Sequence, residues 1–374
     1  MSPGSKSILD AFRSLLEVNL GLKENERLLL LGDRGPDGGS AELVEELSSL
    51  AETVHPRTET LIFNPAGGHG MEPPYEAWEA AFGESGVTKL EEGGVLGRIL
   101  RKSGDEKDME RAGAITEEFI DEIVQTVIAL THYSTSHTGF RKLLTAFGNA
   151  RYASMPLFER EMFFTSMDID WTKLAASTQT LARAMEGADK CEIKSPNGTD
   201  LVVGVTGRPV KADDGMLKVP GSFGNLPAGE VFLAPLEGTA EGKLVVEWSD
   251  VSKLRSPLTI NVKKGRAISV EGDEPEEVRW LDNLFSAHPN NTNIAELGIG
   301  TNPGATRPDN VLESEKILGT IHVAFGDNHT FGGVTVAPFH QDFVVFEASL
   351  VAVWNRGGGR RVLLTEGSPG WMGM

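Results

Sequence analysis

The feature that most constrains the fold is a run of four leucines, residues 28–31, which glycines close. A short apolar run between glycines is typical of a strand buried on both faces of a parallel sheet. Residues 7–20, which precede the leucine run, place apolar side chains at helical spacing. A helix that Ser40 can cap follows, and residues 58–64 are the next strand. This alternation predicts an open α/β fold with a mainly parallel sheet.

The alternation of helix and strand patterns continues to about residue 188. The loop 32–40 lacks the GxGxxG spacing of a dinucleotide site, so no Rossmann cofactor is expected. We therefore predict that residues 1–188 form a first domain of the α/β class. Its further predicted helices and strand are residues 74–84, 88–102, 125–130 and 170–189.

The pattern changes after residue 188 to short alternating strands and turns. Asn197-Gly198 is a strong signal for a β-hairpin. A single helix is predicted at residues 275–288, before further strand patterns. The sequence thus predicts a β-rich α+β domain over residues 189–374, and we expect this domain to bind metal.

Composition excludes several classes of protein. A net charge of −19 argues against a nucleic-acid binder, which needs a basic face. Cys191 is the single cysteine, which excludes an internal disulfide and a thiolate metal cluster. We find no signal peptide and no run of about 20 apolar residues, so we expect a cytoplasmic protein without a membrane partner.

Residues 295–343 concentrate the side chains that bind divalent metals. This stretch holds three of the eight histidines, together with several carboxylates. Imidazole nitrogens and carboxylate oxygens form a suitable ligand set for a divalent ion. The residues concerned are Glu296, Glu313, Glu315, His322, His329, His340 and Asp342.

Each candidate has an ordinary structural interpretation as well. His340 and Asp342 share one face if the segment is extended, which suits a common ion but also a surface pair. His322 alternates with apolar residues, as a core histidine of a strand would. Glu230 precedes an apolar run, where a solvated carboxylate at a strand edge is common, and Glu296 lies before a glycine-rich turn, where it is free to point inward. No single residue decides between these interpretations.

The order of the motifs raises the odds of a metal site. GEVFLAP, AELGIGTNPGA, IHVAFGDNHTFGG and HQDF follow one another, after STSHTGFRKLL and SPNGTDL. In this order they resemble the M29 metallopeptidases over about residues 125–345. The resemblance implies a dinuclear metal site in the second domain. Its implied ligands are Glu230, Glu296, His322, His340 and Asp342.

Two positions depart from the family pattern. The family has a functional glutamate shortly before the strand histidine, and Glu315 matches it best, although it lies seven residues before His322. The family has a tyrosine seven residues after that histidine, where this chain has His329. A histidine can donate a hydrogen bond to an oxyanion only in the right protonation state or tautomer. We predict Glu315 and His329 as the catalytic residues.

The resemblance implies a metal-dependent aminopeptidase. Two Zn, Co or Mn ions would activate a water that attacks a peptide or small aminoacyl substrate. In the first domain, His137 opens a helix after a strand, and Arg141 follows one turn later. Both are candidate substrate-binding residues, with helix capping as the alternative for His137. The resemblance also implies a homodimer.

Two other functions stay open at this stage. Iron-dependent 2,5-dihydroxypyridine dioxygenases resemble the same family, and Glu296, His340 and Asp342 would then hold one iron ion. In that case Glu230 and His322 would lie outside the metal's ligand set, and His137 or His329 could be the base. A relative that has lost catalysis and only binds a ligand is the third possibility. The number and identity of the bound metal ions would separate the three.

Overall fold

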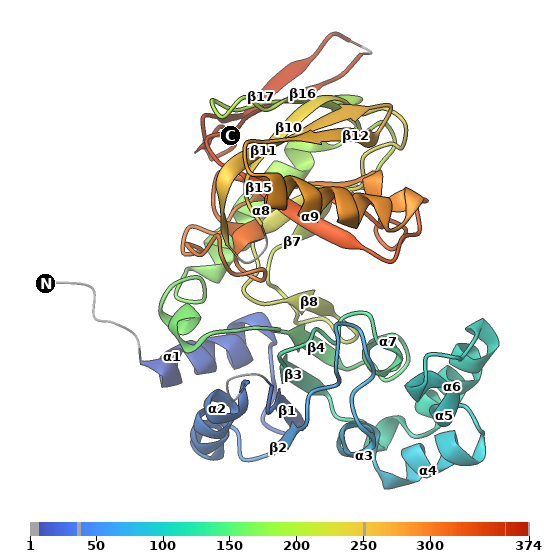
Figure 1. The fold of residues 1–374 in the computed structure, drawn as a ribbon. Helices are drawn as coiled ribbons and strands as arrows, with labels where there is room; N and C mark the ends of the chain where they lie inside the picture. The colour runs from blue at the N-terminus through green and yellow to red at the C-terminus, as the bar shows by residue number, and fades with distance from the viewer. Residues whose placement is uncertain (1–6, 36–38, 250–251, 356, 373–374) are drawn as a thin grey trace, which may run out of the picture. The chain divides into compact units, whose positions relative to one another are not determined.

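The structure is a computed structural model that describes residues 7–35, 39–249, 252–355 and 357–372 (Figure 1). The chain divides into two compact units. Unit 1 contains Met1–Asp168 and Gly215–Pro227, and unit 2 contains Ile169–Asp214 and Ala228–Met374. Residues 36–38 of the predicted loop 32–40 lie outside the described residues.

Unit 1 is built on a five-stranded sheet in which every described pairing is parallel. The four-leucine run forms an inner strand of this sheet, and all of its side chains are buried. The strand order is β2-β1-β3-β4-β8, so the predicted open parallel sheet is confirmed. The strands are β1 (Leu28–Asp33), β2 (Thr58–Phe63), β3 (Thr126–Leu130), β4 (Arg151–Ser154) and β8 (Phe223–Asn225).

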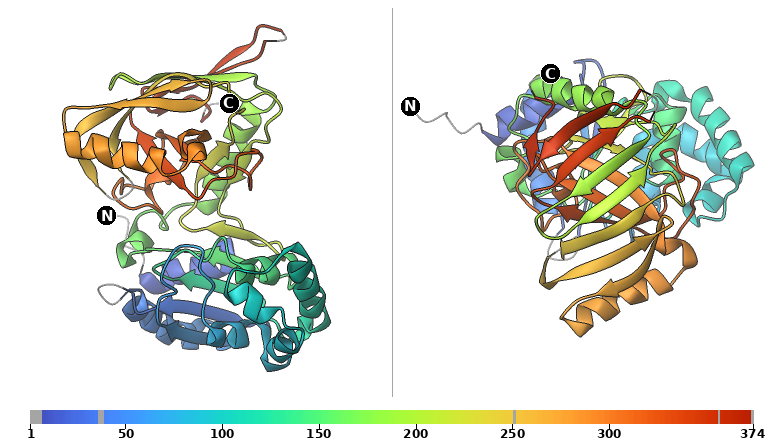
Figure 2. Two further views of the ribbon diagram at one scale, coloured as in Figure 1. Left: turned by 45° about the vertical axis from the view of Figure 1, so that its right-hand side comes forward. Right: turned by 90° about the horizontal axis from the view of Figure 1, so that it is seen from above.

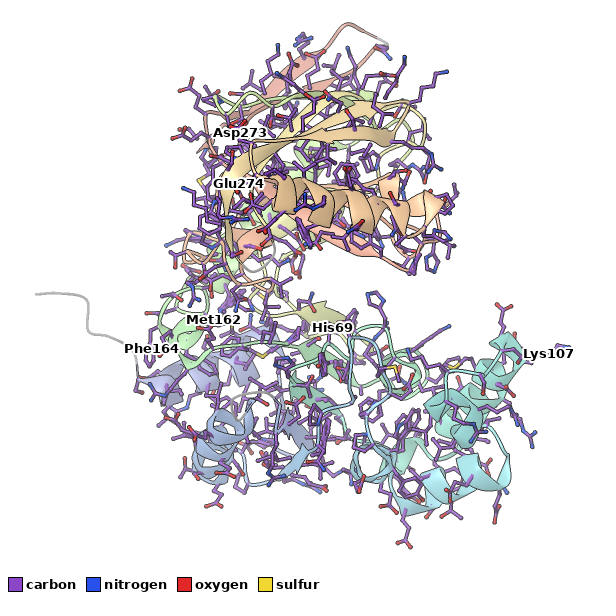
Figure 3. All side chains as sticks on the ribbon, viewed as in Figure 1. His69, Lys107, Met162, Phe164, Asp273 and Glu274 are labelled. Atoms are coloured by element: carbon purple, nitrogen blue, oxygen red, sulfur yellow. The ribbon has the colours of Figure 1, made fainter. Side chains whose placement is uncertain are left out.

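Helices connect these strands, with two differences from the sequence prediction. The helix predicted at residues 88–102 is divided, because the chain turns at Gly93-Gly94 and Gly94 adopts a φ of +68°. A helix that the sequence analysis missed follows it. The helices are α1 (Ile8–Ser14), α2 (Ala41–Val54), α3 (Tyr75–Phe82), α4 (Glu84–Glu92), α5 (Leu96–Leu100), α6 (Glu106–Glu118) and α7 (Gly139–Ala146). Figure 3 shows Lys107 of α6 pointing away from the chain.

The structure divides the chain at a different place from the predicted boundary at residue 188. Helix α8 (Trp171–Met185) belongs to unit 2, because its apolar face joins that unit's core through residues such as Leu181 and Met185. Strand β8 returns to unit 1, where it pairs in parallel with β4. A short excursion of this kind has no signature in the local sequence pattern.

Unit 2 contains two antiparallel sheets, which confirms the predicted β-rich character. The larger sheet has the order β12-β11-β10-β6-β5-β16-β17-β18, which can be followed by colour in the right-hand view of Figure 2. Asn197-Gly198 forms the predicted hairpin between its strands β5 and β6. Its strands are β5 (Lys190–Lys194), β6 (Asp200–Gly204), β10 (Glu241–Trp248), β11 (Lys253–Lys263), β12 (Arg266–Glu271), β16 (Ser349–Val353), β17 (Arg360–Thr365) and β18 (Ser368–Pro369).

The smaller sheet of unit 2 has the order β15-β14-β13-β9-β7. Apolar side chains from both sheets meet in one core, to which β6 and β10 contribute from the larger sheet and β13 and β14 from the smaller. Helix α9 (Pro275–Ser286) packs against β11 and β12, and Asp273 and Glu274 precede its first turn (Figure 3). The strands of the smaller sheet are β7 (Lys211–Asp213), β9 (Glu230–Leu233), β13 (Ile294–Gly300), β14 (Ile321–Gly326) and β15 (His340–Val345).

None of the described helices is both long and apolar enough to cross a bilayer.

The buried cysteine provides a test of the unit 2 core. Cys191 lies on β5 between β6 and β16, and burial raises the pKa of its thiol to about 12. The thiol is therefore protonated at pH 8, and the thiolate is the reactive form. We predict that a disulfide reagent such as DTNB labels Cys191 at pH 8 only after the protein is unfolded in guanidinium chloride. Rapid labelling of the folded protein would show that this core is open.

Candidate metal centre

All five predicted metal ligands lie on one face of the smaller sheet of unit 2. Side chains alternate between the two faces of a strand. Leu297 and Ile299 of β13 and Val323 of β14 point into the core. The residues between core positions on these strands therefore point to the opposite face. On that face the sheet carries Glu230 (β9), Glu296 (β13), His322 (β14), His340 and Asp342 (β15).

The pairing of β13 with β14 makes room for His322. In this register Gly298 lies directly opposite His322. A Cβ at position 298 would lie only 1.9 Å from Nε2 of His322, which no side chain could tolerate. Glycine at this position therefore lets the imidazole lie across β13 and face Glu296.

Glu230, Glu296 and His322 form the first group of ligand-type side chains, and all three residues are buried. Nε2 of His322 lies 3.2 Å from Oε2 of Glu230 and 3.4 Å from Oε1 of Glu296. Burial lowers the pKa of the His322 imidazole, but the contacts to the two carboxylates outweigh this, and the pKa lies well above its ordinary value. In the absence of metal the ring is thus positively charged.

Glu296, His340 and Asp342 form the second group, which shares Glu296 with the first. Nε2 of His340 lies 3.5 Å from Oε2 of Glu296 and 3.4 Å from Oδ2 of Asp342. The other ring nitrogen of His340, Nδ1, is 2.7 Å from the carbonyl oxygen of Asp327. A hydrogen bond of this kind fixes the ring orientation and leaves Nε2 for an ion. The His340 side chain is 31% exposed, so this group is reached from solvent.

The carboxylate of Asp342 is held in its charged form. Burial raises the pKa of Asp342, but the positive charge of His340 and its hydrogen bond outweigh burial and bring the pKa down to about 2. The pKa of His340 rises correspondingly, since the neighbouring Asp342 and Glu296 outweigh the effect of burial. A divalent ion would replace these imidazolium protons, as metal ligation requires the neutral ring.

A short 3₁₀ helix, η6 (Ser314–Lys316), covers this face of the sheet, since it packs against β13 and β15. It brings Lys316 into the centre, with Nζ 2.7 Å from Oε1 of Glu230 and 2.7 Å from Oε2 of Glu315. Burial lowers the pKa of the Lys316 amine, but Glu230 and Glu315 outweigh it and the pKa lies well above its ordinary value. The amine is therefore an ammonium ion, and only 1% of the side chain is exposed.

The environment of Glu315 favours the neutral form of its side chain, whereas that of Lys316 favours the charged form. Burial raises the pKa of its carboxyl group, Lys316 lowers it, and the negative charges of Asp342 and Glu230 raise it further, so that the pKa is about 8. The sequence analysis predicted Glu315 as a catalytic residue and missed Lys316 beside it. The local sequence gave no signal for this role, because lysine is rarely buried unless it is paired, and the partner Glu230 lies far away in the chain.

The side chains of both groups fit a metal ion such as iron. In each group the candidate ligand atoms lie within 4.8 Å of one another. Oδ1 of Asp342 is buried and makes no hydrogen bond to any described residue. Buried polar atoms are normally satisfied, and a bound ion with its waters would satisfy such a centre. Carboxylate and imidazole ligands suit iron, manganese and zinc alike.

The remaining predicted site residues have other contacts. Nδ1 of His329 lies 2.8 Å from both carboxylate oxygens of Asp327, and half of the His329 side chain is exposed. Its assignment as a catalytic donor stays a prediction. In unit 1, Nε of Arg141 donates to the carbonyl of Ser136 at 2.7 Å, and its guanidinium lies 4.2 Å above the ring of Phe223.

His137 also belongs to unit 1, where it is exposed and its carbonyl oxygen accepts a hydrogen bond from Nζ of Lys102 at 3.3 Å. Thr138, the next residue, caps α7 by accepting a hydrogen bond from the backbone N–H of Arg141. The helix-capping role considered for His137 is thus carried out by Thr138. The substrate-binding roles of His137 and Arg141 stay predictions.

A cavity of about 60 Å³ borders the second group. Glu315, His340 and Asp342 contribute its polar wall, and Val311 and Val344 contribute apolar surface. A small molecule in this cavity would therefore meet ligand-type side chains on one side and aliphatic side chains on another. The first group, with Lys316, is more deeply buried.

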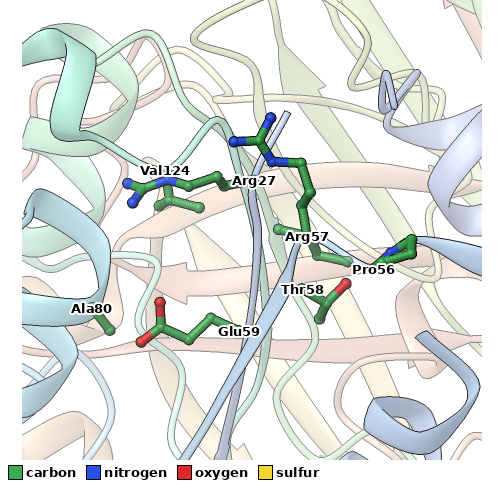
Figure 4. Close-up of a pocket in the computed structure, with 8 residues that line it drawn as sticks. Arg27, Pro56, Arg57, Thr58, Glu59, Ala80 and Val124 are labelled. Atoms are coloured by element: carbon green, nitrogen blue, oxygen red, sulfur yellow. The ribbon is translucent and has the colours of Figure 1, made fainter. Parts of the chain in front are cut away.

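A larger cavity, of about 190 Å³, lies in unit 1 between Arg27, Arg57, Glu59 and Ala80 (Figure 4). Its two arginines are engaged by the backbone, since Arg57 donates to the carbonyl of Asn25 at 2.9 Å and Arg27 donates to that of Glu122. These arginines therefore hold the chain at this end of the sheet.

The chain belongs to the family described as 2,5-dihydroxypyridine 5,6-dioxygenase, because the family model matches residues 166–352, half of the chain. The matched region contains all of the candidate metal ligands. A curated relative, the 2,5-dihydroxypyridine 5,6-dioxygenase of Pseudomonas putida, is 25% identical over 173 residues, which are 42% of this chain. The chain matches only about half (49%) of that relative's length.

Solved structures share the fold over almost the whole chain. The 2,5-dihydroxypyridine dioxygenase of Pseudomonas putida KT2440 has a TM-score of 0.67 and 17% identity, over 97% of this chain and 98% of that one. AmpT from Thermus thermophilus has a TM-score of 0.55 and 15% identity, over the same shares of the two chains. AmpT is an M29 aminopeptidase, so the predicted resemblance to an M29-like scaffold is confirmed as a likeness of fold.

The predicted enzyme class is wrong. A metalloaminopeptidase is a hydrolase, whereas the family model and the curated relative are both dioxygenases, which are oxidoreductases. The prediction that the protein is a protease is wrong for the same reason. Motif order identified the scaffold that the two enzyme types share, but five competent ligand residues do not distinguish hydrolysis from oxygen chemistry. The predicted homodimer stays a prediction.

Substitution of Gly298 tests the geometry of the centre. We predict that Gly298→Ala forces His322 away from Glu296 and lowers the amount of metal bound per chain several-fold, measured by elemental analysis after desalting. Gly359→Ala is the matched control in the same unit, because a Cβ there would meet its nearest neighbour at 3.7 Å. Full metal content in the Gly298→Ala protein would contradict the proposed path of the imidazole.

Proposed function

We propose that this protein is a metal-dependent dioxygenase that opens the ring of a small hydroxylated aromatic compound, a hydroxypyridine or a close analogue. The observation that carries the proposal is the second group, Glu296, His340 and Asp342, which borders a cavity and lies inside the region matched by the dioxygenase family. The substrate class comes from the names of the family and of the Pseudomonas putida relative.

The ion would be held by Glu296, His340 and Asp342. Nε2 of His340 lies within 3.5 Å of both carboxylates, and its Nδ1 contact to the backbone orients the ring toward them. A set of three imidazole and carboxylate ligands leaves positions open, as in non-haem iron oxygenases. When bound, iron would supply the redox chemistry that the reaction of dioxygen with a ring requires.

The protein side chains would position the ring and move its proton. Val311 and Val344 offer aliphatic surface to the faces of a ring in the cavity. Glu315 lines the same cavity, and a carboxyl group with a pKa of about 8 is close to working pH, where it can exchange a proton efficiently. Glu315 would thus take the proton from a ring hydroxyl through a carboxylate oxygen.

We predict that the protein, loaded anaerobically with Fe(II), consumes about one O₂ for each hydroxypyridine ring lost, measured with an oxygen electrode and by ring absorbance. His340→Ala and Asp342→Asn each remove a ligand. They should lower the rate at least about 100-fold, since substitutions of the residues that merely support ligands already cost 10–100-fold.

The control variant is His288→Asn. His288 belongs to the same unit and caps a 3₁₀ helix through its side chain, a role that asparagine also performs. This variant should keep the full rate. If the iron-loaded protein consumed no O₂ with any hydroxylated aromatic ring across a panel of pyridines and benzenes, the proposed function would be wrong.

A further inference from the structure

We propose that the ammonium group of Lys316 takes the position of a second divalent cation. The centre then holds one ion in the native protein, and Glu230 and Glu315 form a latent second metal site that opens when the lysine is removed. The inference concerns the metal centre of the proposed function and rests on it for the identity of the first ion.

The contacts of Lys316 are those of a cation held at a metal site. Its Nζ lies 2.7 Å from a carboxylate oxygen of Glu230 and 2.7 Å from one of Glu315, and the side chain is 1% exposed. Glu230 is at the same time a member of the first ligand-type group, with its other oxygen 3.2 Å from Nε2 of His322. The ammonium therefore binds one oxygen of Glu230, a residue that together with Glu296 and His322 could otherwise hold a metal ion.

Burial of the carboxylates requires a cation at this position. Glu230 and Glu315 reach the centre from β9 and η6, and both side chains are largely removed from water. Burying an unpaired carboxylate is strongly unfavourable, so the charged Glu230 needs a positive partner at short range, and Glu315 needs one whenever it is deprotonated. Lys316 lies between the two and partners both, which is the role that a bridging metal ion plays in a dinuclear site.

The lysine and a second ion exclude each other. A metal bound by Glu230 would lie about 2.0–2.2 Å from a carboxylate oxygen. The ammonium already lies 2.7 Å from Oε1 of that residue, so the two cations would be close neighbours in a buried place where their repulsion is poorly screened. Because Lys316 is covalently part of the chain and enclosed, it does not exchange with metal ions in solution.

The second group, Glu296, His340 and Asp342, is not blocked by the lysine. His340 and Asp342 line the cavity, and within the described chain Lys316 forms its hydrogen bonds and ion pairs with Glu230 and Glu315 and not with these two residues. A metal ion can therefore enter the group of Glu296, His340 and Asp342 while the lysine stays in place.

The test is the number of ions bound before and after removal of the ammonium. Apo-protein, prepared with a chelator, is titrated with Mn²⁺, desalted and analysed for manganese, and its EPR spectrum is recorded. We expect one Mn²⁺ per chain in the wild type, with the six-line spectrum of an isolated ion. We expect two per chain in Lys316→Met, with the broadened spectrum of a coupled pair. Methionine keeps the length of the side chain without its charge.

Two further variants control this comparison. Lys194→Met removes an ammonium that is 70% exposed in the same unit, and should still bind one ion. The double variant Lys316→Met/Glu230→Gln removes a ligand of the latent site together with the lysine, and should also bind one ion. If Lys316→Met is unfolded without metal, Mn²⁺ should restore its folding, seen as a melting temperature that rises with Mn²⁺ concentration.

Three results would overturn the inference. They are two ions in the wild type, one ion in folded Lys316→Met, and a Lys316→Met protein that Mn²⁺ does not return to the folded state. None of these readouts depends on ring cleavage. A wild-type protein with one ion and no dioxygenase activity would therefore refute the proposed function and leave the role of Lys316 standing.

Discussion

The structure of unit 2 depends on the neutralisation of buried carboxylates. Glu230, Glu296, Glu315 and Asp342 gather on the covered face of a five-stranded sheet, where none could be charged without a positive partner. Lys316 and the two imidazoles provide that charge when no metal is present. The same arrangement prepares the centre for an ion, since a metal only has to replace the imidazolium protons.

The register of the strands fixes the positions of these charged side chains. The β13–β14 pairing sets Gly298 opposite His322, and a side chain at 298 would collide with the ring. The core side of these strands is filled by leucine, isoleucine, valine and phenylalanine from both sheets, so a slip of one residue would exchange the core with the ligands. The rigid core of unit 2 thus determines where the ligand atoms lie.

The sequence predicted the parts that local patterns encode. Period-two alternation gave β14 and β15 and the face that carries His322, His340 and Asp342, and the leucine run gave the parallel sheet. It missed what only tertiary contacts determine: the return of β8 to unit 1 and the burial of the Lys316 side chain against Glu230. It also gave the wrong enzyme class, because one ligand set and one scaffold serve both hydrolysis and oxygen chemistry.

The central claim is that one metal ion binds at Glu296, His340 and Asp342 while Lys316 fills the neighbouring cation position. Anomalous diffraction from crystals of the Fe(II)-loaded protein at the iron absorption edge tests it most directly. The account predicts a single peak per chain within bonding distance of His340 and Asp342, with the ammonium of Lys316 still between Glu230 and Glu315. A second peak between those two glutamates, with the lysine displaced, would contradict it.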